Sequence, residues 1–151
     1  MNENKQINVV ILAGGFGTRL RPVVADRQKV LAKVAGRPFL TFILDQIEKA
    51  ALRNVIISTG YMAEDVEKSI GKSYRSLQIR YSKEDTPLGT AGALRLACDK
   101  SRSQFIMVMN GDSYINADLA QYVEWFRRQD ASAAMILKQL HDTGAFGRVD
   151  I

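Results

Sequence analysis

A glycine-rich loop followed by cations is the first feature of this sequence that could do chemistry. Gly14, Gly15 and Gly17 come directly after an apolar run, and Arg19 and Lys29 follow them. Glycines let a backbone turn sharply and bring its N–H groups close to an anion. A guanidinium binds phosphate oxygens bidentately. The pattern predicts a polyphosphate site, although a glycine-rich turn without such cations is as often structural as functional.

The charge distribution favours the same interpretation. Six basic side chains and one acidic side chain lie between positions 19 and 37, and they account for the whole formal excess of +5. Such a segment is either a solvated surface or an anion site. The loop is no dinucleotide fingerprint, because Leu20 stands where the third glycine belongs, and no Gly-Lys-Ser/Thr follows as in a Walker loop.

Composition excludes several other classes of protein. The single cysteine, Cys98, excludes a disulfide framework, and the single histidine, His141, excludes a multi-histidine metal site. No apolar run approaches the roughly 18–20 residues of a membrane span, and no leader sequence is visible. The basic segment lacks interleaved aromatic residues, so we expect no nucleic-acid binding. These features predict a cytoplasmic protein with no membrane contact.

The elements that must position these residues alternate between strand and helix. Strands are expected at 7–12, 54–59, 77–82 and 105–109, a fifth at 132–140, and the start of another at 148–151. Helices are expected from Pro38 to about residue 51, at 63–70, at 90–100, and at 117–129 with Asn116 as the N-cap. This alternation predicts an α/β fold of Rossmann-like, three-layer αβα type with a mostly parallel sheet.

Such a sheet predicts where the site lies. In the common 3-2-1-4 strand order, the first and fourth strands are neighbours at the point where the order reverses. The loops that follow them are 13–18 and 110–112, so Asn110, Gly111 and Asp112 would meet the glycine loop. Asp112 is also a good turn former, and that interpretation stays open.

Four segments resemble one family, the sugar-1-phosphate nucleotidyltransferases. The segment from Leu12 to Leu20 resembles the family signature, and Lys29 stands where the family has a lysine. The segments 36–40, 87–93 and 110–112 resemble, in order, the entry into a helix, the base-recognition segment and the metal-binding strand end. The details look most like the mannose-1-phosphate and heptose-1-phosphate guanylyltransferases.

The resemblance implies a reaction, a fold of the nucleotide-diphospho-sugar transferase type, and roles for named residues. A nucleoside monophosphate would pass from a triphosphate to a sugar 1-phosphate, giving a nucleoside-diphosphate sugar and pyrophosphate. Arg19, Lys29 and Asp112 would be catalytic, and Asp112 would hold Mg²⁺. The expected nucleotide-binding residues are Leu12, Ala13, Gly14, Gly15, Gly17, Thr18, Glu84, Pro87, Gly89, Thr90, Asn110 and Gly111.

The base is indicated by Glu84 and Asp85. A carboxylate there could accept hydrogen bonds from N1–H and the 2-amino group of guanine, which favours GTP. The alternative, that these two residues only form a solvated acidic loop, carries equal weight. Gln28 and Val30 depart from the family, which usually flanks its lysine with prolines.

Residues 1–151 are expected to form one nucleotide-binding domain without the C-terminal sugar-binding part and without a second metal-binding aspartate. The oligomeric state stays open, and a homo-oligomer is one possibility. Two alternatives to the enzymatic function also remain. One is a catalytically silent relative that acts as a nucleotide sensor or structural subunit. The other is an unrelated Rossmann-like binding module.

Overall fold

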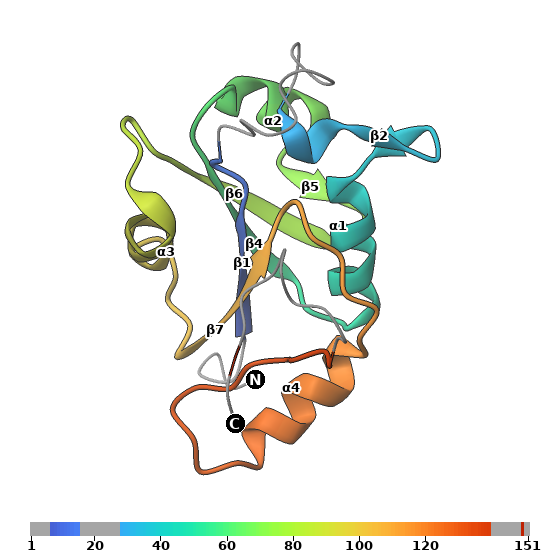
Figure 1. The fold of residues 1–151 in the computed structure, drawn as a ribbon, viewed down its shortest axis with the longest axis vertical. Helices are drawn as coiled ribbons and strands as arrows, with labels where there is room; N and C mark the ends of the chain where they lie inside the picture. Colours follow the sequence, from blue (N-terminus) through green and yellow to red (C-terminus); the bar gives the residue numbers. More distant parts are fainter. Residues whose placement is uncertain (1–6, 16–27, 140–148, 150–151) are drawn as a thin grey trace.

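A parallel sheet between helices organises the molecule (Figure 1). The computed structural model describes residues 7–15, 28–139 and 149. In chain order the strands are β1 (Ile7–Leu12), β2 (Lys33–Val34), β3 (Arg37–Pro38), β4 (Asn54–Thr59), β5 (Ser73–Tyr74), β6 (Leu77–Lys83) and β7 (Phe105–Asn110). The helices are the 3₁₀ turn η2 (Lys29–Leu31), α1 (Leu40–Lys49), α2 (Ala63–Ile70), α3 (Gly89–Cys98) and α4 (Leu119–Arg127).

The sheet has the order β5-β6-β4-β1-β7, in which β6, β4, β1 and β7 run parallel and the short β5 pairs antiparallel with β6. Among the four long strands this is the 3-2-1-4 order expected from the sequence. Figure 1 shows α3 on one face of the sheet and α1 on the other. The predicted α/β fold with three layers is therefore confirmed.

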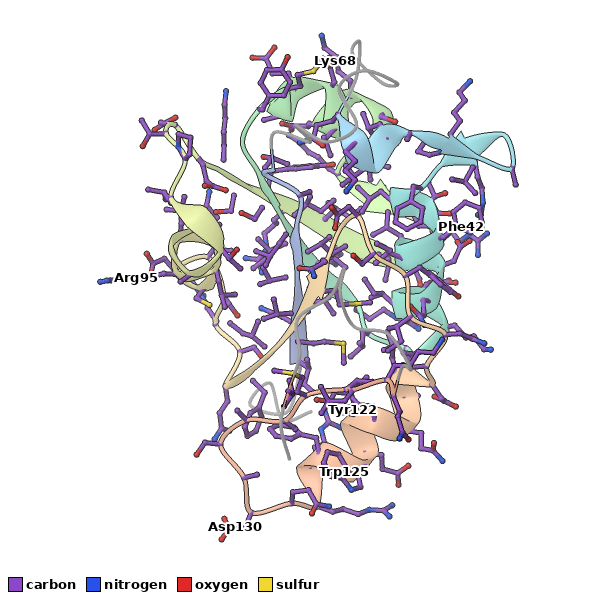
Figure 2. All side chains as sticks on the ribbon, in the orientation of Figure 1. Phe42, Lys68, Arg95, Tyr122, Trp125 and Asp130 are labelled. Atoms are coloured by element: carbon purple, nitrogen blue, oxygen red, sulfur yellow. The ribbon has the colours of Figure 1, made fainter. Side chains whose placement is uncertain are left out.

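The two faces of the sheet carry cores of different size. Alternate β1 side chains, Val9 and Ile11, pack toward α1, whose Ile43 and Ile47 are fully buried. The other face has a smaller core, in which Ala97 of α3 meets Val10 and Ile56. Arg95 points outward from α3, away from the sheet (Figure 2). The thick core on the α1 side and the thin one under α3 follow from the side-chain sizes on those helices.

The starts of α1 and α4 differ from the sequence prediction. Pro38 does not begin the helix: it lies in β3 opposite Lys33, and α1 begins at Leu40. Proline has no N–H to donate, which suits a short hairpin strand as well as a helix start. The α4 N-cap is Asp118 rather than Asn116, because the Asp118 carboxylate accepts from the backbone N–H of Gln121 at 3.0 Å.

The predicted strand at 132–140 is wrong for residues 132–139, which form no ladder. Residues 132–136 line a hollow of about 740 Å³ together with β7 and α4. A strand requires a neighbouring backbone at hydrogen-bonding distance, and β1 is the only strand that pairs with β7 in the described part of the chain. Residue 140 and most of the strand predicted at 148–151 lie outside the described residues. No helix in the ranges described is long and apolar enough to span a bilayer.

Candidate functional site

A cleft of about 790 Å³ opens at the carboxyl ends of the parallel strands. It lies where ligands bind in open α/β sheets, because the loops after neighbouring strands diverge there. The cleft is lined by these predicted site residues: Leu12, Ala13, Gly14, Gly15, Lys29, Glu84, Pro87, Gly89, Thr90, Asn110 and Asp112. Gly17, Thr18 and Arg19 lie outside the described residues. Three of the four segments that resemble the family therefore contribute to one hollow together with Lys29, whereas the segment 36–40 does not line it.

Lys29 and Asp112 form an ion pair inside this cleft. The Nζ of Lys29 donates to Oδ2 of Asp112 at 2.7 Å, and the two side chains are 34% and 40% exposed. Lys29 opens the η2 turn, whereas Asp112 follows β7. The hydroxyl of Ser113 lies 3.3 Å from the other Asp112 oxygen. A compact cation and a carboxylate thus stand side by side and open to ligand.

Gly111 explains why Asp112 comes so close to the first loop. Its N–H donates to the Leu12 carbonyl at 2.8 Å, extending the contact between β1 and β7 by one residue. A Cβ built on Gly111 would stand 2.9 Å from the Leu12 carbonyl oxygen and 3.1 Å from Val30 Cγ1. Gly111 does not line the cleft itself. If Gly111 contributes to nucleotide binding as predicted, it does so by letting the backbone after β7 pack closely against β1, and so by placing Asp112 in the cleft.

Glu84 meets the glycine loop directly. Its Oε2 accepts from the Leu88 N–H at 3.0 Å, and its own N–H donates to the Thr59 carbonyl at 2.8 Å. A Cβ on Gly14 would stand 2.5 Å from Glu84 Oε1. Glycine at position 14 is therefore the residue that leaves room for this carboxylate, which holds the entry to α3 and keeps further lone pairs for a ligand.

The N-terminus of α3 forms another wall of the cleft. Gly89 has φ of +70°, a left-handed conformation that glycine adopts without strain, and Thr90 follows it. The N-cap residue Leu88 offers no side-chain hydrogen bond to the first turn. Pro87 precedes this turn and lines the cleft with it. The first N–H groups of α3 have no partner within the helix, and this end of the helix lines the cleft.

Several residues that line the cleft were not among the predicted site residues, and Gln28, Gly60 and Tyr61 are three of them. Gln28 is only 2% exposed and donates to backbone carbonyls of two loops that line the cleft, those after β1 and β4. Its replacement of an expected proline was the available signal. Tyr61 follows β4 beside Gly60, and both line the cleft. Their place could be inferred from the strand order, because β4 neighbours β1 and its loop must lie next to the glycine loop.

The donor set suits one type of metal. The described residues contain no group of three or more His, Cys, Asp or Glu side chains that could hold an ion by themselves. Asp112 offers a partly exposed carboxylate in the cleft, which Glu84 and Asp85 also line. Mg²⁺ keeps several waters and binds through one or two carboxylates together with substrate phosphates. The residues present therefore fit Mg²⁺ that arrives with a phosphate ligand, and do not fit a closed structural metal site.

Known proteins resemble this chain in both sequence and fold. A mannose-1-phosphate guanylyltransferase of Mycobacterium tuberculosis is 40% identical over 145 residues, which cover 95% of this chain and 40% of that protein. A D-glycero-alpha-D-manno-heptose 1-phosphate guanylyltransferase of Aneurinibacillus thermoaerophilus is 35% identical over 143 residues, covering 95% and 62%. This chain thus spans roughly 40–60% of the length of these curated relatives.

A solved structure gives the same result for the fold. The crystal structure of HddC from Yersinia pseudotuberculosis complexed with GMP-PN is similar with a TM-score of 0.73 and 33% identity, over 83% of this chain and 56% of that one. The family model described as nucleotidyl transferase matches residues 8–151, nearly the whole chain. This membership excludes the alternative of an unrelated binding module. The chain belongs to the nucleotidyl transferase family.

Proposed function

We propose that this chain binds the nucleotide in an enzyme that transfers GMP from GTP to a sugar 1-phosphate. The observation that carries the proposal is the Lys29–Asp112 pair at the edge of a cleft whose other walls are glycine backbone and the start of α3. Support for guanine and for a mannose- or heptose-type phosphate comes from the relatives' names and from the complex with GMP-PN.

The chemistry requires positioning more than proton transfer. A phosphate oxygen of the sugar 1-phosphate attacks the α-phosphorus of GTP, the bond from that phosphorus to the α–β bridging oxygen breaks, and pyrophosphate leaves. A phosphate monoester has its second pKa near about 6, so the nucleophile is already largely dianionic and needs no general base. The protein must instead hold two anions together and stabilise the charge on the departing group.

The residues of the cleft divide this work. Lys29 supplies a compact positive charge beside the α-phosphate, and the backbone N–H groups of the glycine loop hold the phosphate tail. Asp112 would hold Mg²⁺, which when bound supplies Lewis-acid stabilisation of the phosphate oxygens. Lys29 and Asp112 pair with each other in the free protein, and both are partly exposed. Lys29 can therefore also donate to phosphate, and Asp112 can also bind the metal.

Glu84 is the proposed determinant of the base. Guanine presents N1–H and a 2-amino group on one edge, and a carboxylate accepts from both. Adenine cannot offer this pair of donors. Glu84 lies between Gly14 and the start of α3, so a base seated on the small residues of α3 would place its edge beside this carboxylate.

A second candidate, nucleotide binding without turnover, is favoured by one observation. Among the described residues, Asp112 is the only carboxylate that pairs with Lys29, and it belongs to no group of three or more His, Cys, Asp or Glu side chains that could hold a metal ion. Transfer and binding are separated by two measurements on the same sample. Thermal shift with each of the four nucleoside triphosphates and Mg²⁺ reports binding, and pyrophosphate release in the presence of mannose 1-phosphate or heptose 1-phosphate reports transfer. Preferential stabilisation by GTP supports the site. Pyrophosphate release then supports the enzyme, and its absence supports the silent relative.

A further inference from the structure

Gln28 connects two loops of the cleft through one side chain. Its Nε2 lies 2.8 Å from the Ala13 carbonyl, 3.3 Å from the Gly15 carbonyl and 3.2 Å from the Tyr61 carbonyl. The first two belong to the glycine loop after β1, and the third belongs to the loop after β4. The side chain is 2% exposed, so water does not compete effectively for these carbonyls.

The hydrogen bonding of this carboxamide has one strong contact and two shared ones. A primary amide has two N–H donors, so three acceptors cannot each receive their own proton. The Ala13 bond is short, and the two longer contacts to Gly15 and Tyr61 have the distances of a shared, three-centre bond. The carboxamide oxygen meanwhile lies 3.4 Å from the N–H of Val30, within the η2 turn. Both ends of the carboxamide are therefore engaged.

These contacts fix the direction of the glycine loop. In a trans peptide the C=O and N–H groups point in opposite directions. Holding the Ala13 carbonyl on Gln28 therefore turns the Gly14 N–H away from Gln28. The same residue directly precedes Lys29, and its carboxamide oxygen caps the turn that carries the lysine. One side chain thus sets the orientation of loop amides and of the cation that pairs with Asp112.

We propose that Gln28 is a positioning residue for the phosphate tail, holding the glycine loop and Lys29 in the arrangement that binds a triphosphate. This inference rests on the proposed function, since it assigns a role at the same site. Proline at this position could make neither contact, because it has no side-chain donor or acceptor. Gln28 therefore fixes the position of Lys29 through hydrogen bonds, whereas a proline at this position would fix it through a rigid backbone.

The test compares Gln28→Met with a matched control, Gln46→Met. Gln46 Nε2 likewise donates to two backbone carbonyls, those of Ile115 at 2.7 Å and Ala117 at 3.0 Å, and it does not line the cleft. Methionine retains the length of glutamine and removes the donors. Calorimetry gives the affinities for GTP and for GMP in Mg²⁺, and circular dichroism gives Tm. We expect Gln28→Met to weaken GTP at least tenfold and GMP less than twofold, while Gln46→Met lowers Tm but leaves GTP affinity within twofold.

Two outcomes overturn different claims. If the unmodified chain binds GTP and Gln28→Met binds it within twofold, or if both variants lose GTP and GMP equally, Gln28 has no positioning role. If the unmodified chain binds no nucleoside triphosphate, the proposed function fails, and the role of Gln28 fails with it.

NMR of the unmodified chain keeps the test decisive should Gln28→Met not fold. The Gln28 side-chain NH₂ protons are expected to exchange slowly and to shift when pyrophosphate and Mg²⁺ are added. Exchange as fast as that of an exposed glutamine, or no shift on saturation, would contradict the inference.

Discussion

Lys29 Nζ lies 2.7 Å from Asp112 Oδ2, although 83 positions separate the two residues in the sequence. The pair forms because Gln28, which precedes Lys29, is hydrogen-bonded to the Ala13 carbonyl after β1, and because β7 is the neighbour of β1 in the sheet. Its charges are opposite, yet both side chains are partly exposed, so each keeps polar groups that a ligand can reach. The roles of Lys29 and Asp112 in nucleotide binding can therefore be tested separately by substituting each residue.

Lys29→Ala is expected to weaken GTP binding about 10- to 100-fold, or roughly 1.4–2.8 kcal/mol, because a charge-assisted contact to phosphate is lost. The free energy of unfolding should fall by less than about 1 kcal/mol, since the ion pair is partly exposed. Lys33→Ala is the control for net charge, because Lys33 is exposed in β2 and does not line the cleft. Equal losses of GTP affinity in the two variants would show a general charge effect instead.

Glu84→Gln is expected to lower the preference for GTP over ATP at least tenfold. The substitution replaces an acceptor by an amide whose N–H₂ opposes the donors of guanine, while the amide oxygen can still accept from the Leu88 N–H. ATP affinity should change less than twofold. Competition titration with both nucleotides measures the ratio, and an unaltered ratio would remove Glu84 from base recognition.

Gly111→Ala is expected to lower the free energy of unfolding by about 1–3 kcal/mol, because added volume at a tightly packed position forces the backbone to move. The new Cβ would stand 2.9 Å from the Leu12 carbonyl oxygen. Gly15→Ala is the stability control, since its Cβ would meet nothing within 4 Å. Urea unfolding compares the two, and equal midpoints would contradict the close approach of β1 and β7.

Asp45 of α1 binds Arg37 of β3 and Tyr74 of β5. Burial raises the pKa of Asp45, but hydrogen bonds from Tyr74 and Arg37 and the charges of Arg37 and Arg75 together hold the pKa below its usual value. A carboxyl with a lowered pKa stabilises the folded state above its unfolded pKa of about 3.9, and this stabilisation is lost as the pH falls through the folded pKa.

Asp45→Asn should therefore cost about 1–2 kcal/mol of stability at pH 7, and the difference from the unmodified chain should shrink as the pH falls below about 4. Urea unfolding at pH 7 and pH 3 measures both values. A difference that stays constant between these pH values would mean that the charge of Asp45 contributes nothing.

Much of the fold could be predicted because its signals are local. The strand at 54–59 and the helix at 63–70 have the bounds expected from their apolar periodicity. The 3-2-1-4 order follows from alternating strands and helices with short connections. Residues 132–139 could not be placed, because alternation shows that a segment can be a strand and does not show that a partner strand lies beside it.

The site was partly predictable for a similar reason. Residues that follow buried strands, such as Gly14 and Asp112, meet because parallel strands end at one edge. The contacts of Gln28 could not be foreseen, since a glutamine among basic residues carries no periodic signal and its three carbonyl partners come from two distant loops. Tertiary hydrogen bonds of this kind depend on how the loops lie relative to one another in space, which the spacing of residues in the sequence does not specify.

The dependence of GTP affinity on Mg²⁺ tests the central claim most directly, measured by calorimetry with and without the metal for the unmodified chain, Asp112→Asn and the control Asp99→Asn. Asp99 is exposed at the end of α3 and does not line the cleft. The account predicts that Mg²⁺ strengthens GTP binding at least tenfold in the unmodified chain and in Asp99→Asn, and by less than twofold in Asp112→Asn. An undiminished effect of Mg²⁺ in Asp112→Asn would contradict it.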